Sequence, residues 1–289
     1  MDTSLKGKTA IVTGANTGIG KPTAKSLAAR GCKVIMACRS EERASAAKSD
    51  LLEDDNITDE QLVCMKLDLS SLQSVREFAN KFNADQDRLD LLVNNAAVYT
   101  PKREETDDGY EAHMGVNHLG HFLLTNLLLD KLKSSAPSRI VNVAAEGHMF
   151  GPIDFDDFQS KQNWSSFTAV SRSKTANILF TVELARRLKN TGVTAYALHP
   201  GFVKTEIGRN MGKCNIINIL YKCCPCFSIS PADGSKTTLY CCTDPKLEKE
   251  SGKYYNECRE KPAKPHASDP ELATKLWAIS EELVGLKSD

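Results

Sequence analysis

Two short segments of the sequence combine residue types and spacings that can support chemistry. The first lies between an apolar run and an amphipathic stretch, and it reads Thr13-Gly14-Ala15-Asn16-Thr17-Gly18-Ile19-Gly20. Glycines allow a backbone to turn sharply and approach a pyrophosphate, which the positive end of the next helix stabilises. A glycine-rich turn without a ligand is the alternative, but the flanking elements favour a dinucleotide site. Its expected contacts come from Gly14, Asn16, Thr17, Gly18, Ile19 and Gly20.

The second segment runs from Thr168 to Asn177 and is expected to be helical. Val170 and Lys174 are four residues apart, so their side chains lie on one face of a helix. A lysine at this spacing lowers the pKa of a hydroxyl beside it, because a positive charge favours the anion. Val170 carries no hydroxyl, so Lys174 has no such partner at this position of the helix face.

The end of the second apolar run indicates which dinucleotide is bound. A carboxylate there would hydrogen-bond the adenosine ribose of NAD, whereas an arginine pairs with the 2′-phosphate of NADP. The sequence has Arg39 at this point and no Asp or Glu from Val34 to Ser40. Arg39 as a merely solvated residue is the alternative. We therefore expect NADP(H).

Alternating strand and helix patterns must position these residues. The expected strands are Thr9–Val12, Val34–Ala37, Leu62–Leu67, Leu89–Val93, Arg139–Val143, Thr194–Leu198 and Lys253–Tyr255. The expected helices are Gly20–Arg30, Glu41–Glu53, Leu72–Phe82, Tyr110–Lys133 and Thr168–Lys189. This alternation predicts an α/β fold, a doubly wound, Rossmann-like parallel sheet of about seven strands with helices on both faces. No linker or repeat divides residues 1–289, so we expect a single domain.

Composition narrows the class of protein. The chain has 289 residues, 41% of them hydrophobic, and its 37 basic residues balance its 37 acidic ones. That balance argues against nucleic-acid binding. The polar N-terminus has neither the apolar core of a signal peptide nor the length of a membrane span. We expect a cytoplasmic protein.

The motifs resemble those of the short-chain dehydrogenase/reductase family, and the likeness runs from about Leu5 to about Leu286. The runs Val116–Thr125, Ile153–Ser160 and Thr191–Thr205 are similar to the NADP-preferring retinol dehydrogenases. The resemblance implies that Asp68 holds the adenine ring and that Asn117 holds a water in a proton relay. It also implies that Lys174 lies beside the nicotinamide ribose. Further cofactor contacts are implied for Asn94, Ala96, Pro200, Gly201 and Thr205.

Two positions depart from the family's pattern. The family's Tyr-x-x-x-Lys motif is Val170-x-x-x-Lys174 here, and Ala145 stands where its serine binds the reacting oxygen. A general acid contributes roughly 10²–10⁴ in rate and an oxyanion donor roughly 10²–10³. We therefore expect a cofactor-binding but catalytically impaired protein. The alternative is an active oxidoreductase that interconverts retinal-like or other apolar aldehydes and alcohols through an unusual proton donor. The residues considered for that donor are Ser171, Ser173, His148, Tyr99 and Tyr110.

A cysteine-rich segment at about 205–230 is expected to form a substrate lid. Its apolar run and clustered cysteines also allow a peripheral membrane contact or lipidation. A zinc site from Cys223, Cys226 and the Cys241-Cys242 pair is a weaker alternative, because no second C-x-x-C completes it; we expect no metal. The expected ligand is a small apolar aldehyde, alcohol or retinoid-like molecule, and a homo-oligomer is compatible with the sequence.

Overall fold

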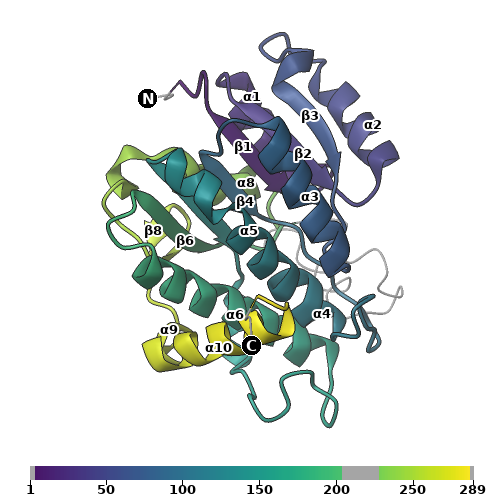
Figure 1. Cartoon of the computed structure of the whole chain (residues 1–289), viewed down its shortest axis with the longest axis vertical. Coiled ribbons are helices and arrows are strands. Elements are labelled where there is room, and N and C mark those ends of the chain that lie inside the picture. Colours follow the sequence, from purple (N-terminus) through teal and green to yellow (C-terminus); the bar gives the residue numbers. More distant parts are fainter. Residues whose placement is uncertain (1–3, 204–227, 287–289) are drawn as a thin grey trace.

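A computed structural model describes residues 4–203 and 228–286 of the chain. Its centre is an eight-stranded sheet in the order β3-β2-β1-β4-β5-β6-β7-β8 (Figure 1). Neighbouring strands pair in parallel except β7 and β8, which are antiparallel. The strands are β1 (Thr9–Thr13), β2 (Lys33–Cys38), β3 (Leu62–Lys66), β4 (Leu91–Asn94), β5 (Ser138–Val143), β6 (Val193–His199), β7 (Lys253–Asn256) and β8 (Arg259–Glu260).

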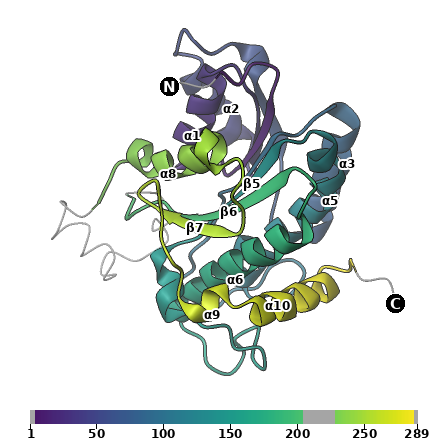
Figure 2. The ribbon, with the colours of Figure 1, turned by 90° about the vertical axis from the view of Figure 1, so that its left-hand side faces the viewer.

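Helices cover both faces of the sheet (Figure 2). One layer consists of α1 (Gly20–Ala29), α2 (Glu41–Leu51) and α8 (Pro231–Thr243), which share a buried apolar cluster with the strands. The other layer consists of α3 (Leu72–Asp85), α5 (Gly120–Ser134) and α6 (Ser166–Arg187). Outside that layer α10 (Pro270–Leu283) lies along α6. Trp277 of α10 packs against the rings of Phe122 on α5 and Phe180 on α6. The predicted doubly wound α/β fold is confirmed.

Short helical turns complete the described chain. They are α4 (Ala112–Met114), α9 (Pro265–Ser268) and the turns Asp59–Gln61, Glu146–Phe150 and Pro245–Leu247. A π-helical turn, Gly115–Leu119, joins α4 to α5. The helix expected over Tyr110–Lys133 is therefore three pieces rather than one. Such π turns are rare and concentrate at functional sites.

The sequence patterns missed part of the C-terminal region. The sheet has an eighth strand because Arg259 and Glu260 fold back antiparallel on β7. Both residues are exposed, so no apolar run marked this strand. The helices α8, α9 and α10 were not predicted either, and α10 is helical because its Ala273, Leu276 and Trp277 bury one face.

The parallel strands bring several loops to one edge of the sheet. These loops follow the carboxyl ends of β1, β2, β3, β4, β5 and β6. Open parallel sheets bind ligands at this edge, near the point where the strand order reverses. In this sheet the order reverses between β1 and β4. Among the described residues, the glycine-rich turn, Arg39 and the Val170–Lys174 pair reach this edge or the helix beside it.

Candidate active site

A cavity of about 630 Å³ lies at this edge of the sheet. It brings together residues that are far apart in the sequence, from the glycine-rich turn to α6. The predicted site residues that line it are Gly14, Asn16, Thr17, Gly18, Ile19, Arg39, Asp68, Ala96, Ala145, Val170, Lys174, Pro200 and Gly201. Thr205, and residues 204–227 of the expected lid, lie outside the described residues.

The glycine-rich turn depends on close backbone packing. Gly14 has a φ of +66°, which is the left-handed region that favours glycine. A Cβ on Gly20 would lie 2.3 Å from the carbonyl oxygen of Gly14 and 2.7 Å from Nδ2 of Asn95. Gly20 itself does not line the cavity. It allows the first turn of α1 to sit against the end of β1, so its role is to shape the turn.

Asn95 and Thr13 fix the turn against the neighbouring strand, a role that the sequence analysis did not assign to either residue. Thr13 Oγ1 accepts hydrogen bonds of 2.9 Å from the backbone N–H groups of Asn95 and Ala96. Asn95 Nδ2 donates back to the Thr13 carbonyl at 2.8 Å. Asn94, which was expected at the cofactor, is buried and donates instead to Thr125 and Asn142. It therefore braces the sheet rather than lining the cavity.

The loops after β2 and β3 supply the charged residues at one part of the cavity. Arg39 is exposed and lines it, together with Ser40 and Arg43, which the sequence reasoning did not single out. Ser40 begins α2 by accepting a hydrogen bond from the Arg43 backbone N–H. Asp68 Oδ1 accepts hydrogen bonds from the backbone and hydroxyl of Ser70, which fixes its carboxylate. Two guanidinium groups on this wall suit an anionic ligand.

Beside β5 and α6 the cavity wall carries the methyl group of Ala145 and the isopropyl group of Val170, at the two positions where the resemblance predicts hydroxyls. Ala145 and Val170 both line the cavity, and neither is fully buried. Lys174 follows Val170 by one helical turn, and its Nζ donates to the Val143 carbonyl at 3.1 Å. Burial lowers the pKa of Lys174 to about 8. The structure thus brings Ala145, Val170 and Lys174 together as the sequence predicted.

Asn117 lies behind this wall, in the π-helical turn, and does not line the cavity. Its Oδ1 accepts a hydrogen bond of 2.8 Å from the Val98 backbone N–H. Its Nδ2 donates to the Val98 carbonyl at 3.3 Å and to Ser173 Oγ at 3.0 Å. Since Val98 lines the cavity, Asn117 connects that wall to α6.

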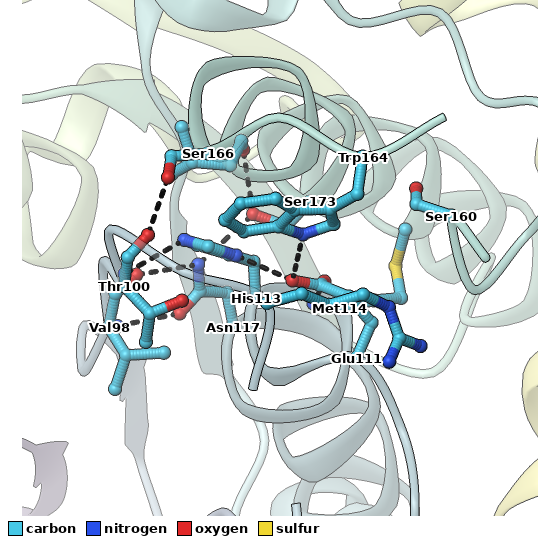
Figure 3. A network of polar contacts seen from close by, with 12 residues as sticks. Val98, Thr100, Glu111, His113, Met114, Asn117, Ser160, Trp164, Ser166 and Ser173 are labelled. Atoms are coloured by element: carbon cyan, nitrogen blue, oxygen red, sulfur yellow. Dashed lines mark hydrogen bonds and ion pairs between the residues drawn. The ribbon is translucent and has the colours of Figure 1, made fainter. Parts of the chain in front are cut away.

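A buried Glu–His pair holds the same wall one turn earlier (Figure 3). The backbone N–H of Thr100 donates to His113 Nε2 at 3.1 Å, so Nδ1 carries the proton and faces Glu111 Oε1 at 2.7 Å. The Glu111 carboxylate also accepts from the Met114 backbone and from Trp164 Nε1. Burial opposes ionisation of Glu111, but these hydrogen bonds hold its pKa below the usual value. The sequence pattern gave no signal for this pair.

Most of the considered substitute proton donors are committed elsewhere. Ser173 Oγ donates to the Val170 carbonyl, and Tyr110 donates to the Leu283 carbonyl. His148 Nδ1 bonds the Ala145 carbonyl, and the Lys264 backbone N–H donates to its Nε2, so both ring nitrogens have partners. Tyr99 and Ser171 do line the cavity. Ser171 Oγ is buried and has no hydrogen-bond partner among the described residues.

Glu146 and His199 also line the cavity, next to Ala145 and Pro200, and the sequence analysis did not name them. The Glu146 carboxylate forms an ion pair with the Lys261 ammonium at 2.7 Å. It also lies 3.9 Å from His199 Nε2. Burial lowers the pKa of His199 to about 4 despite Glu146. The imidazole is therefore neutral at physiological pH, and the Glu146 charge is compensated by Lys261.

The described cysteines are apolar core residues or partly exposed thiols. Cys32, Cys38, Cys241 and Cys242 are buried, and burial raises the pKa of each thiol. Within residues 4–203 and 228–286, no three His, Cys, Asp or Glu side chains gather as metal ligands. Cys223 and Cys226 of the zinc alternative lie outside that range. None of the helices in that range is long and apolar enough to span a bilayer.

Comparison with known proteins agrees with the fold and shows the family. Residues 8–215 match the family profile described as short chain dehydrogenase. Retinol dehydrogenase 14 of Mus musculus is 45% identical over 98% of this chain and 87% of its own length. The chain therefore belongs to the short-chain dehydrogenase family, and within it is related to the retinol dehydrogenases.

Solved structures show the same fold. An uncharacterized protein from Mycobacterium paratuberculosis superposes with a TM-score of 0.76 at 34% identity, over 98% of this chain and 95% of that one. The 3-ketoacyl-(acyl-carrier-protein) reductase from Brucella melitensis, complexed with NADH, gives a TM-score of 0.68 at 23% identity over 88% and 98% of the two chains. The match to the short chain dehydrogenase family itself implies a nicotinamide cofactor.

Proposed function

We propose that this protein binds NADP(H) and an apolar aldehyde, alcohol or retinoid-like ligand, and that its oxidoreductase chemistry is severely impaired. One observation carries the proposal. Ala145 and Val170 line the same cavity as the glycine-rich turn and Lys174. The two positions that lack hydroxyls therefore belong to the same site as the residues suited to a cofactor.

Binding is supported by contacts that do not involve Ala145 or Val170. The positive φ of Gly14 and the close packing at Gly20 let α1 present its N-terminus to a pyrophosphate. Arg39 and Arg43 both line the cavity, and guanidinium groups suit the 2′-phosphate of NADP(H). Lys174 donates one hydrogen bond among the described residues and has two further N–H groups for ribose hydroxyls.

Chemistry is a separate requirement. Bound NADPH would supply the hydride, but the substrate oxygen also needs a proton and a hydrogen-bond donor as negative charge develops on it. Neither a methyl group at Ala145 nor an isopropyl group at Val170 can donate. Asn117 and Lys174 can still orient groups behind the cofactor, but neither replaces a phenol that faces the substrate.

The wall of the cavity favours an apolar ligand. Val98, Tyr99, Val116, Phe167 and Val203 contribute carbon surface to it. The name of the related mouse protein refers to retinol. A retinoid-like or other apolar aldehyde or alcohol is therefore the ligand class that we propose.

The test measures binding and turnover on the same purified chain. NADPH titration, followed by cofactor fluorescence, should show saturable binding that Lys174→Met weakens. Turnover of a panel of apolar aldehydes with NADPH should stay at least a hundredfold below the kcat of about 10 s⁻¹ that is typical of enzymes. Sustained turnover near that value would instead support an active oxidoreductase with an unusual donor. No NADPH binding would refute the proposal altogether.

A further inference from the structure

Lys174 is the one lysine among the described residues that line the cavity. It is buried on α6, and only 7% of its surface is exposed. Its hydrogen bond to the Val143 carbonyl is its single hydrogen bond within the described part of the chain. A buried primary amine thus borders an apolar cavity with little to hold its charge.

The substitution at Val170 removes the partner that a lysine at this position would otherwise have. Val170 precedes Lys174 by one helical turn and lies on the same face, but it offers neither a hydroxyl nor an anion. The two carboxylates that line the cavity are engaged, Asp68 by Ser70 and Glu146 by Lys261. With desolvation unopposed, the pKa of Lys174 falls to about 8. Roughly a tenth of the side chain is then a neutral amine at pH 7.

A neutral amine in an apolar pocket is a nucleophile toward carbonyl carbon. We propose that, when no nicotinamide cofactor fills the cavity, Lys174 captures an apolar aldehyde as a covalent imine. The Lys174 Nζ attacks the carbonyl carbon and forms a C–N bond. Both amine hydrogens leave with the carbonyl oxygen as one water molecule, and a C=N bond remains. Nothing is oxidised or reduced, so the step needs no co-reactant.

The surroundings of Lys174 select the class of carbonyl compound. Ala145 and Val170 leave open the part of the wall that a serine and a tyrosine would occupy, so a carbonyl group can approach the amine. Val98, Val116 and Phe167 add apolar surface to the same cavity. Its charged residues Arg39, Arg43 and Asp68 come from the segments after β2 and β3. An aldehyde with a hydrocarbon tail fits both features, whereas a charged or sugar-like aldehyde would leave polar groups unpaired there.

Cofactor and aldehyde would then compete for the same amine. This part of the inference rests on the proposed NADP(H) binding, in which Lys174 hydrogen-bonds the cofactor. At a cofactor concentration of about ten times Kd, roughly nine-tenths of the sites are filled, so capture should slow about tenfold.

The test is reductive trapping on the whole chain without cofactor. The protein is treated with nonanal and sodium cyanoborohydride, and alkylated peptides are quantified by mass spectrometry. We expect the peptide that contains Lys174 to be labelled first, ahead of exposed lysines such as Lys81. Lys174→Met should remove that adduct, and Val170→Tyr should reduce it severalfold while leaving the amine in place. Nonan-1-ol, which cannot form an imine, should give no adduct.

The outcomes separate this inference from the proposed function. Labelling spread over exposed lysines, with Lys174 not enriched in the folded native chain, would overturn the inference even if NADPH binds. Enriched labelling that saturating NADP⁺ does not slow, in protein shown by titration to bind it, would overturn the competition between the two ligands. Enriched labelling in a chain that fails the titration would support imine capture and refute the proposed cofactor.

Discussion

Under the proposed function, introducing hydroxyls at positions 170 and 145 should raise the rate of aldehyde reduction. The change is the double replacement Val170→Tyr and Ala145→Ser. Both side chains face the cavity, and Lys174 lies one helical turn beyond position 170, so a phenol there would have the ammonium beside it. The positive charge would lower the pKa of that phenol toward the working range.

The expected gain follows from the two missing functions. A positioned acid is worth roughly 10²–10⁴ in rate and a donor to the developing oxyanion roughly 10²–10³. Because groups that act as a unit are not additive, we expect the double variant to gain about 10³–10⁵, less than the full product. This equals about 4–7 kcal/mol of transition-state stabilisation.

The assay is NADPH oxidation with an apolar aldehyde, read alongside the Kd for NADPH. The Kd should change by less than about threefold, since neither position carries the main cofactor contacts. Val170→Phe combined with Ala145→Ser is the matched control, because it fills the same space without a phenol, and it should stay slow. If the Tyr–Ser variant is no faster than the native chain while it binds NADPH equally well, the assignment of these positions is wrong.

Arg39, Glu111 and two buried histidines give further measurable outcomes. Arg39→Ala should weaken NADPH binding by roughly ten- to a hundredfold, because a charge-assisted hydrogen bond is lost. NADH binding should stay unchanged. Equal weakening of both would exclude a contact between Arg39 and the 2′-phosphate. Glu111→Leu should lower the free energy of unfolding in urea by about 3–5 kcal/mol, because it leaves the buried His113 and Trp164 donors unpaired. Glu111→Gln should lower that free energy by less. An equal loss in the two variants would show that the charge of the carboxylate contributes nothing. Burial lowers the pKa of His118 to about 3 and of His121 to about 4. The unfolded chain therefore binds more protons below pH 6.5, and stability should fall by up to about 1.4 kcal/mol per pH unit for each histidine between pH 6.5 and 4. Urea midpoints that stay constant over this range would contradict that expectation.

The sheet was predictable because buried parallel strands leave a simple pattern. All seven predicted strands exist within two residues of the expected ends, and most of them contain a short apolar run such as Val34–Ala37. The strand β8 has two exposed residues and no such run. The π-helical turn around Asn117 has no periodic signature that separates it from an α-helix, so one continuous helix was expected there.

Some cavity residues could be predicted from the sequence because they directly follow a predicted strand. Glycines after β1 and an arginine after β2 are read directly from the sequence. Asn95, Arg43, Glu146 and His199 reach the cavity only because separate loops meet there, and the Glu111–His113 pair is visible only once the chain is folded. Several expectations stay predictions. They are the roles of the site residues, the single domain, the cytoplasmic location, the lid and its membrane contact, and a homo-oligomer.

The structure explains why binding and chemistry can be lost independently in this fold. The cofactor side depends on the backbone, since a Cβ at Gly20 would collide with the Gly14 carbonyl and Asn95, and changes there would disturb the packing of α1 on β1. Ala145 and Val170 instead project partly exposed side chains into the cavity and belong to none of the buried apolar clusters. Substitution at these two positions should therefore change the free energy of unfolding by no more than about 0.5–1 kcal/mol. A site arranged in this way can lose its proton donor while its fold and its cofactor cradle are kept.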